Sequence, residues 1–258
     1  MNTSNNNEIL NDDENSSDRS SDLTSNDLTS NEKAGCDGKG YADLGHTKTD
    51  LLRQQNSGFE EVVFGKGKTE SQLLDIIGHA KTNSGRVFVT DVASETAHTA
   101  TTQFPDLVWD QEAQTLAMGQ HDSVSHRKLL LISAGTSDLR ALKEAENTLS
   151  FFGFQPTRLV DVGVAGLHRL LSNLEEIRTN DLLIVFAGME GALPSVLAGL
   201  TSAPIVAVPT SVGTGVSEGG RVALDSMLSS CSPGITVVNI DNGFGAAMFA
   251  AKLLKRFD

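Results

Sequence analysis

The chain has 258 residues, a formal net charge of −13 and a pI near 4.8. This length is enough for one large or two modest domains, and so acidic a surface repels nucleic-acid phosphates and anionic lipids. The sequence has two cysteines, no apolar run near the roughly 18 residues of a membrane span, and no basic, apolar leader. We therefore expect a soluble cytoplasmic protein with no disulfide framework, nucleic-acid partner or membrane contact.

Residues 1–35 consist almost entirely of Asn, Ser, Asp, Glu and Thr, with a few isolated aliphatic residues. Such a segment cannot bury enough apolar area to offset the entropy that is lost when it becomes ordered. We expect a disordered acidic tail over 1–35.

Residues 36–125 mix strand and helix patterns and predict a small N-terminal α/β domain. The expected elements are a strand over 61–64, a turn at GKGKT, a helix that Thr69 caps and that runs to Lys81, and a strand over 86–91. A further helix near 94–101 and a strand near 106–109 follow. A polar connector that begins at Gln120 leads out of this domain.

Residues 126–258 repeat one pattern, in which aliphatic residues run into Gly, Ser, Thr or Asn and then into a helical periodicity. This is typical of βα units around a buried parallel sheet. Strands are expected at 129–134, 157–162, 182–187, 205–208 and 235–238, with a last helix over 246–256. Thr136 or Ser137 is expected to cap the first helix, which should end at Gly153. The fold class is α/β, a flavodoxin-like, doubly wound parallel sheet in a three-layer sandwich.

The loops after these strands carry the candidate binding residues, since small-molecule sites form at the carboxyl ends of parallel strands. In the first loop, AGTSD, the residues Gly135, Thr136 and Ser137 could bind an anion at the helix start, and Asp138 suits the first-turn dipole. An ordinary capped helix explains the same residues equally well.

The loop AGMEG places Met189 and Glu190 between two glycines, Gly188 and Gly191, directly after a buried strand. A carboxylate there would be partly desolvated, which would raise its pKa toward general acid/base use. The alternative is a solvated side chain at a loop tip, and the residues alone slightly favour that alternative.

Two further loops have binding potential. The segment PTSVGTGVSEGG, which contains Ser211 and Gly213, is rich in Gly and hydroxyl groups, as are loops that wrap phosphates or sugars. In NIDNG, Asn239, Asp241 and Asn242 could bind a substrate hydroxyl or a metal, or merely cap the last helix. Cys231, at a helix end, is by residue type more often a small buried apolar group than a nucleophile.

Several of these segments match a known family: AGTSDL, DVGVAGLHRLL, AGMEGALPSV, PTSVG, the SC-x-x-G pattern at 230–234, and VNIDNGFGAA. Together with GFEEVVFGKGKT nearer the N-terminus, they resemble the pyridinium-3,5-biscarboxylic acid mononucleotide synthases, over residues 41–257. The C-terminal half is more distantly similar to the phosphoribosylaminoimidazole carboxylases and mutases.

The resemblance implies an enzyme of nickel-pincer nucleotide cofactor synthesis for lactate racemase. Such an enzyme carboxylates the pyridinium ring of nicotinic acid adenine dinucleotide with carbon dioxide or bicarbonate. It also hydrolyses the phosphoanhydride, giving pyridinium-3,5-biscarboxylic acid mononucleotide and AMP. The resemblance further implies magnesium as the metal, with ligands that the sequence does not identify, and a homo-octamer.

The electron-poor ring explains why the family needs a thiol, because addition of a thiolate para to the ring nitrogen makes the meta carbon nucleophilic. On the resemblance, Cys231 is that nucleophile, Glu190 is an acid/base group, and Ser137 and Asp138 contact the ribose phosphate and the carboxylate. Asp138 is also counted among the catalytic residues. The implied substrate-binding residues are Gly135, Thr136, Ser137, Gly188, Met189, Ser211, Gly213, Asn239, Asp241 and Asn242.

The chain departs from the family pattern at three positions. Thr214 and Glu218 stand where the glycine loop usually carries an aromatic pair, and Asp91 stands where the second strand commonly ends in arginine. One alternative function is an aminoimidazole ribonucleotide carboxylase or mutase, although those enzymes carry histidine where this chain has Glu190. The other is a non-catalytic nucleotide-binding homologue, which Thr214 and Glu218 favour and which the retained Cys231 disfavours.

Overall fold

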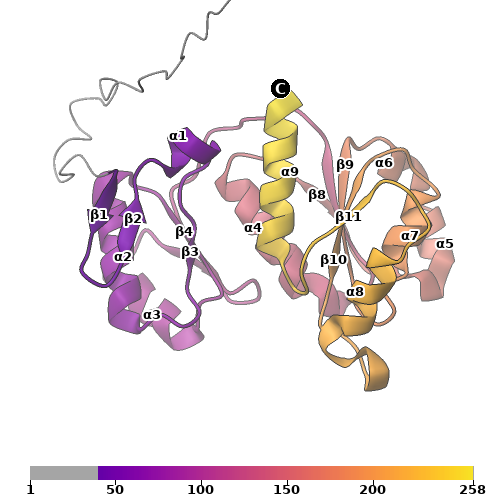
Figure 1. Ribbon diagram of the computed structural model, residues 1–258, viewed down its shortest axis with the longest axis horizontal. Coiled ribbons are helices and arrows are strands. Elements are labelled where there is room, and N and C mark those ends of the chain that lie inside the picture. The colour runs from indigo at the N-terminus through magenta and orange to yellow at the C-terminus, as the bar shows by residue number, and fades with distance from the viewer. Residues whose placement is uncertain (1–39, 258) are drawn as a thin grey trace, which may run out of the picture. The chain divides into compact units, whose positions relative to one another are not determined.

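The computed structural model describes residues 40–257, which belong to one compact unit (Figure 1). The tail predicted over 1–35, together with Cys36, lies outside the described residues. Among the helices that are described, none is long and apolar enough to cross a membrane.

The larger sheet has five parallel strands in the order β11-β10-β9-β7-β8 (Figure 1). The chain therefore passes from β7 to the edge strand β8, returns to β9 on the other side of β7, and continues outward to β10 and β11. This is the expected doubly wound, flavodoxin-like arrangement. In the central pair, Leu131 of β7 lies opposite Ile184 of β9. The strands are β7 Leu129–Ser133, β8 Thr157–Leu159, β9 Leu182–Ala187, β10 Ile205–Pro209 and β11 Ile235–Val237.

Alternate residues of the central strands pack on opposite faces of this sheet, so both faces are covered. Leu182, Ile184 and Phe186 face the helices α4 and α9, whereas Leu183 and Val185 face the side that α5 to α8 cover. Each side chain of this size that is fully buried contributes roughly 1.5–3 kcal/mol, which explains why apolar runs specify these strands. The helices are α4 Leu139–Phe151, α5 Leu167–Leu171, α6 Leu174–Arg178, α7 Leu193–Ala198, α8 Arg221–Leu228 and α9 Gly243–Phe257.

The start of α4 differs from the expectation that Thr136 or Ser137 caps it. A 3-10 helix, Thr136–Asp138, precedes α4, and both Thr136 and Ser137 are exposed. The Gly135 N–H instead donates to Asp138 Oδ2 over 2.8 Å. A side chain at the third position of the turn therefore makes the capping contact, which frees the two hydroxyls.

A second sheet, in the N-terminal part of the described chain, has four strands in the order β3-β4-β6-β5, in which β3 and β4 are parallel. The predicted helix after GKGKT is confirmed, and Thr69 begins it with Gln72 in a reciprocal capping box. The short strands β1, β2 and β6 were not predicted from the sequence. The elements are β1 Tyr41–Asp43, β2 Lys48–Asp50, α1 Arg53–Ser57, β3 Val63–Phe64, α2 Glu70–Asn83, β4 Val87–Thr90, α3 Ser94–Gln103, β5 Val108–Asp110 and β6 Thr115–Met118.

Aromatic contacts join the smaller sheet to α4. The ring of Phe88 in β4 lies 5.2 Å from that of Phe151, and Phe59 lies 5.0 Å from Phe152. His121, in the segment that was expected to be a polar connector, meets the Phe151 ring edge-on and bonds Glu60 over 2.5 Å. This segment therefore packs against α4 and ties the two sheets together.

Candidate active site at the strand ends

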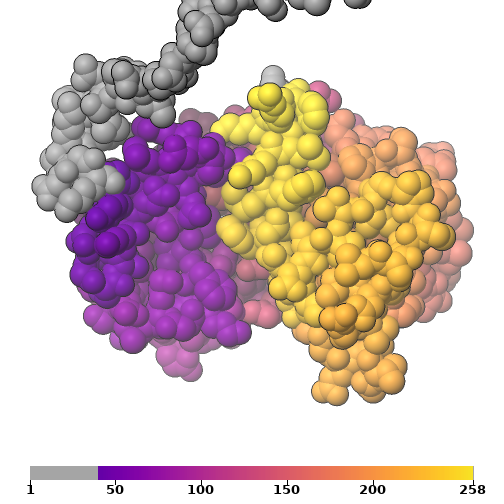
Figure 2. Space-filling view, viewed as in Figure 1, coloured from indigo at the N-terminus to yellow at the C-terminus, as the bar shows by residue number. Residues whose placement is uncertain are grey.

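Four loops follow the carboxyl ends of β7, β9, β10 and β11, and all but one of the predicted site residues lie in them. The turn between β10 and α8 extends beyond the strand ends and projects from the surface (Figures 1 and 2). The prediction that these polar loops share one edge of the sheet is thus confirmed by the parallel strand order.

Asp138 and Thr210 form the centre of this edge. Thr210 Oγ1, after β10, donates to Asp138 Oδ1 over 2.6 Å, and both side chains are buried. The Gly135 N–H occupies the second carboxylate oxygen. The pair therefore fixes the first loop against the third, across the position where β9 ends.

Burial raises the pKa of the Asp138 carboxyl above its ordinary value. Hydrogen bonds from Thr210 and from backbone N–H groups oppose this rise, and the negative charge of Asp241 adds to it. A carboxyl in this position can hold or release a proton closer to neutral pH than a solvated one, as acid/base chemistry requires.

The loop after β9 approaches the same point through its backbone. A Cβ on Gly188 would lie 2.1 Å from the carbonyl oxygen of Val212, so only glycine fits there. Met189 donates its N–H to that carbonyl over 2.7 Å and has φ of 51°. The loop is thereby locked, with Met189 and Glu190 directed to its exposed tip.

Glu190 does not have the partly desolvated position that a general acid/base role suggested. Its side chain is exposed in the single chain, as is that of Met189. The physical reason is the turn at Gly188–Gly191, which carries both side chains beyond the buried strand ends. Desolvation of Glu190 would need a substrate or a second chain over this tip.

Of the remaining predicted residues, some make hydrogen bonds that hold the backbone in place, and others are exposed. Asp241 Oδ1 accepts the Ser211 N–H over 2.8 Å, and Asn242 Oδ1 accepts the Gly245 N–H over 2.7 Å at the start of α9. Asn242 thus caps the last helix, one of the two roles that the sequence left open. Asn239 is exposed, and its Oδ1 accepts the N–H of Ile240.

The glycine loop after β10 is held at Ser211 and Val212 by bonds to neighbouring loops and folds back on itself through the Ser217 N–H, which donates to the Thr214 carbonyl. A Cβ on Gly213 would lie 2.2 Å from the Ser217 carbonyl oxygen, which shows how closely the loop folds on itself. Thr214 and Glu218 are exposed, and Val216 is 89% exposed. The loop therefore offers an apolar and a charged side chain to whatever covers the strand ends.

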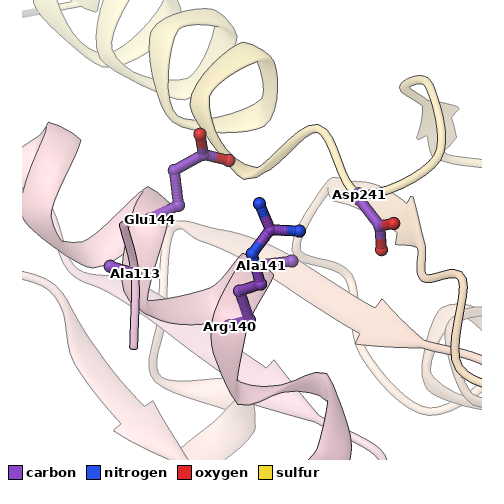
Figure 3. A pocket seen from close by; sticks show the side chains of 5 residues that line it. All are labelled: Ala113, Arg140, Ala141, Glu144 and Asp241. Atoms are coloured by element: carbon purple, nitrogen blue, oxygen red, sulfur yellow. The ribbon is translucent and has the colours of Figure 1, made fainter. Parts of the chain in front are cut away.

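A small pocket beside this edge contains residues that the sequence did not single out. Figure 3 shows the Arg140 guanidinium between the carboxylates of Glu144 and Asp241. Glu144 Oε2 accepts the Phe244 N–H over 3.1 Å and so caps α9 from the neighbouring helix. Burial raises the pKa of Glu144 to about 6, an effect that the Phe244 bond and the Arg140 charge oppose.

The substitution Glu144→Gln should stabilise the protein at neutral pH. Because burial raises the Glu144 pKa from 4.5 to about 6 in the folded chain, wild-type stability loses about 2 kcal/mol as the pH rises through that window. Glutamine keeps an acceptor for the Phe244 N–H but cannot ionise, so its advantage should be absent below pH 4.5 and full above pH 6. Urea unfolding of both proteins across this range checks it, and a difference that does not change with pH would contradict it.

Cys231 is the one predicted site residue that does not follow the carboxyl end of a strand. It lies in the connection from α8 to the amino end of β11, whereas the other candidates follow carboxyl ends of strands. Its thiol is free and exposed. In one chain, therefore, the candidate nucleophile does not share an edge with Asp138 and Glu190.

The loop that carries Cys231 is anchored to α7 by serine side chains. The Ser195 and Ser230 hydroxyls lie 2.7 Å apart, and Ser232 Oγ donates to the Ser195 carbonyl over 3.1 Å. The thiol takes no part in these bonds, so the loop is held while its sulfur stays available.

In the part of the chain that the structure describes, no group of three His, Cys, Asp or Glu side chains could hold a metal ion such as magnesium. Asp138 already accepts a bond on each oxygen, and Asp241 accepts one. Magnesium commonly binds through one or two carboxylates and the phosphates of a substrate. The donor set fits an ion that is bound together with a phosphorylated substrate.

The substitution Thr210→Val should destabilise the protein by about 1.5–3 kcal/mol, because it removes a hydrogen bond to a buried carboxylate at nearly constant volume. It should also raise the pKa of Asp138 further, since the Thr210 bond lowers it. Urea unfolding at pH 7 measures the change. In the control Ser211→Ala, an exposed hydroxyl is lost and the Ser211 N–H bond remains, so stability should stay within about 0.5 kcal/mol of wild type. Equal stability of the two variants would contradict the role of the Asp138–Thr210 pair.

The sequence analysis did not single out Thr210. Its position directly after the buried strand β10 was nevertheless a signal for a site residue, as it was for the next residue, Ser211. Arg140 and Glu144 gave no such signal. They lie on a helix face whose charged residues are typical of a solvent-exposed surface. Only the packing of α4 against α9 brings Glu144 to the start of α9 and gives these residues structural contacts.

Comparison with protein families matches residues 41–120 to a LarB/PurE-like N-terminal domain and residues 128–258 to the AIR carboxylase family. The uncharacterized protein MJ0165 of Methanocaldococcus jannaschii is 37% identical over 217 residues, which cover 81% of this chain and 84% of that protein. The N5-carboxyaminoimidazole ribonucleotide mutase of the same organism is 37% identical over 133 residues, covering 49% of this chain and 78% of the mutase.

Among solved structures, the crystal structure of Treponema denticola PurE is similar to 51% of this chain, with a TM-score of 0.43 and 21% identity, and 82% of that chain is covered.

Proposed function

Because the chain belongs to the LarB family and has an AIR carboxylase-like C-terminal half, we propose that it carboxylates the pyridinium ring of nicotinic acid adenine dinucleotide. It also hydrolyses the phosphoanhydride, and the two operations together release AMP and pyridinium-3,5-biscarboxylic acid mononucleotide for nickel-pincer cofactor synthesis. The observation that carries the proposal is the strand-end site itself. The buried Asp138–Thr210 pair joins the first loop to the third, and the bond from the Met189 N–H to the Val212 carbonyl holds the loop of Glu190 beside the glycine loop.

The chemistry requires a nucleophile, a carbon electrophile and a base. The Cys231 thiolate adds to the ring carbon para to nitrogen, and the ring electrons neutralise the pyridinium charge. The meta carbon of this dihydropyridine attacks carbon dioxide and forms the new C–C bond. Glu190 removes the proton from that carbon, the thiolate leaves, and the ring becomes aromatic again.

The strand-end loops position the substrate for these steps. The hydroxyls of Thr136 and Ser137 are exposed and, with the Ser211 and Gly213 region, lie in the strand-end loops, where the ribose phosphate would bind. Asp138 holds the loops in place and contacts the substrate's polar groups with a carboxyl whose pKa burial has raised. Magnesium, bound with the phosphates, supplies charge neutralisation for cleavage of the anhydride.

We propose that a complete site contains two chains. Because the Cys231 loop enters the amino end of β11, the thiol that meets Glu190 would come from a neighbouring copy in an oligomer, which by the family resemblance would be an octamer. The exposed apolar side chains of Met189 and Val216 at the strand-end loops, and of Leu228 before the Cys231 loop, are suited to covering by such copies.

The test is to incubate the protein with the dinucleotide, carbon-13 bicarbonate and magnesium, and to analyse products by mass spectrometry. The proposal predicts AMP and a mononucleotide with one labelled carboxylate. Conversion of an aminoimidazole ribonucleotide instead would assign the chain to the mutase-like function of its relatives. Binding of the dinucleotide without any product would assign it to a non-catalytic role.

A further inference from the structure

A cavity of about 300 Å³ opens at the carboxyl ends of the parallel strands β3 and β4, in the N-terminal part of the described chain. It lies between the loop that joins β3 to α2 and the loop that joins β4 to α3. Volumes of this size begin the range of small-molecule sites and exceed what an inorganic phosphate fills. None of the residues assigned so far to the substrate line this cavity.

The first loop, Gly65 to Lys68, exposes its backbone to the cavity. The Gly65 N–H donates to the Thr90 carbonyl over 2.7 Å, which holds the two loops side by side. At Gly67 the φ angle is 80°, and an added Cβ would meet nothing within 4 Å. The peptide at Gly67 therefore borders open space, where a ligand can approach it closely.

The charges around the cavity favour an anion, in a chain whose net charge is −13. Lys66 and Lys68 line it, and the carboxylate that accompanies them is Asp91. Arg140 Nη2 binds Asp91 Oδ1 at 3.1 Å, so Asp91 is already neutralised from outside the cavity. Lys66 Nζ lies 3.8 Å from the other Asp91 oxygen and is largely exposed, and Lys68 uses one of its three donors on the Phe64 carbonyl. Both ammonium groups therefore keep donors for an anion.

Part of the lining is apolar. Leu73, Val92 and Ala93 belong to it, and the helix α3 starts at this point without a side-chain cap. A ligand that carries both an anionic group and an apolar ring system would satisfy the lysines and the apolar part of the lining together, which a free phosphate cannot do.

Arg140 connects this cavity to the strand-end site. Its guanidinium bonds Asp91 and Gln114, which line the cavity, and also lies beside Asp241 in the strand-end pocket (Figure 3). The two sites are therefore separated by one side chain, and a substrate with two nucleotide halves could occupy both.

We propose that this cavity is the subsite for the adenylate half of the substrate, with Lys66 and Lys68 binding its phosphate and the apolar part of the lining its base. The inference rests on the proposed function, which supplies a dinucleotide. The cleaved anhydride then lies near Arg140, between the two halves.

The test measures equilibrium binding of AMP to the full chain by calorimetry. The double variant Lys66→Ala, Lys68→Ala should bind AMP roughly tenfold or more weakly, because two charge-assisted bonds to the phosphate are lost. The control Lys81→Ala, at the far end of α2 where Lys81 pairs with Asp106, should bind AMP as wild type does. Circular dichroism checks that each variant is folded.

Further ligands separate the inference from the proposed function. Nicotinic acid mononucleotide should bind the double variant as tightly as wild type, and inorganic phosphate should bind wild type more weakly than AMP does. The inference is overturned if AMP does not bind, if the double variant binds it normally, or if phosphate binds as tightly as AMP. If AMP binding depends on the lysines but no carboxylated product forms, the proposed function fails and the subsite stands.

Discussion

The substitution Cys231→Ser will abolish carboxylation, lowering product formation by at least about a thousandfold, because an alcohol supplies almost no anion at neutral pH for addition to the ring. The fold should survive, since the thiol is exposed and the loop is held by Ser195, Ser230 and Ser232. The rate of labelled mononucleotide formation and the thermal unfolding curve measure the two effects.

The chain provides a matched control for this substitution in its other cysteine. Cys36→Ser should retain the full rate, because the resemblance gives no role to that residue. Near-normal turnover of the Cys231 variant would refute the covalent mechanism, and equal losses in both variants would indicate a general sensitivity to thiol loss.

Glu190→Gln should slow the chemical step by roughly a hundredfold or more while leaving substrate affinity unchanged, because the amide cannot remove the ring proton. The adduct that precedes proton removal should accumulate and be visible as a dihydropyridine absorbance. Stopped-flow absorbance and steady-state kinetics of the wild type and the variant measure this directly.

Asp138 is the alternative base, and the kinetics of Glu190→Gln decide between the two carboxylates. If that variant loses substrate affinity at an unchanged maximal rate, Glu190 is a binding group. The proton would then go to Asp138, which is buried and whose pKa burial raises.

Much of the fold was predictable because the strands of a parallel sheet are buried on both faces. The apolar run of β9 matches the expected 182–187 at both ends, and β10 extends the expected strand by one residue, Pro209. The strand β8 ends at Leu159, earlier than expected, because it is an edge strand with exposed residues and less burial to define it.

The site was predictable only for residues whose position follows from their order along the chain relative to a strand. Each residue that follows a strand lies at the same edge, which correctly grouped Asp138 with Gly188 and Asp241. Tertiary packing alone gives Glu144 its bond to the start of α9 and brings Arg140 to Asp91. The same rule places Cys231 at the amino end of β11, because it precedes the strand that was expected at 235–238.

Co-expression of the Cys231→Ser and Glu190→Gln chains, with a different purification tag on each, tests most directly whether one chain's thiol and another chain's strand-end loops form a single active site. With random assembly, about a quarter of the sites receive an intact thiol and an intact carboxylate from different chains. The account predicts that the mixed oligomer regains about that fraction of wild-type carboxylation, although each variant alone is inactive or slow. A mixed oligomer no more active than the average of the two variants would contradict it, because each chain would then need both residues itself.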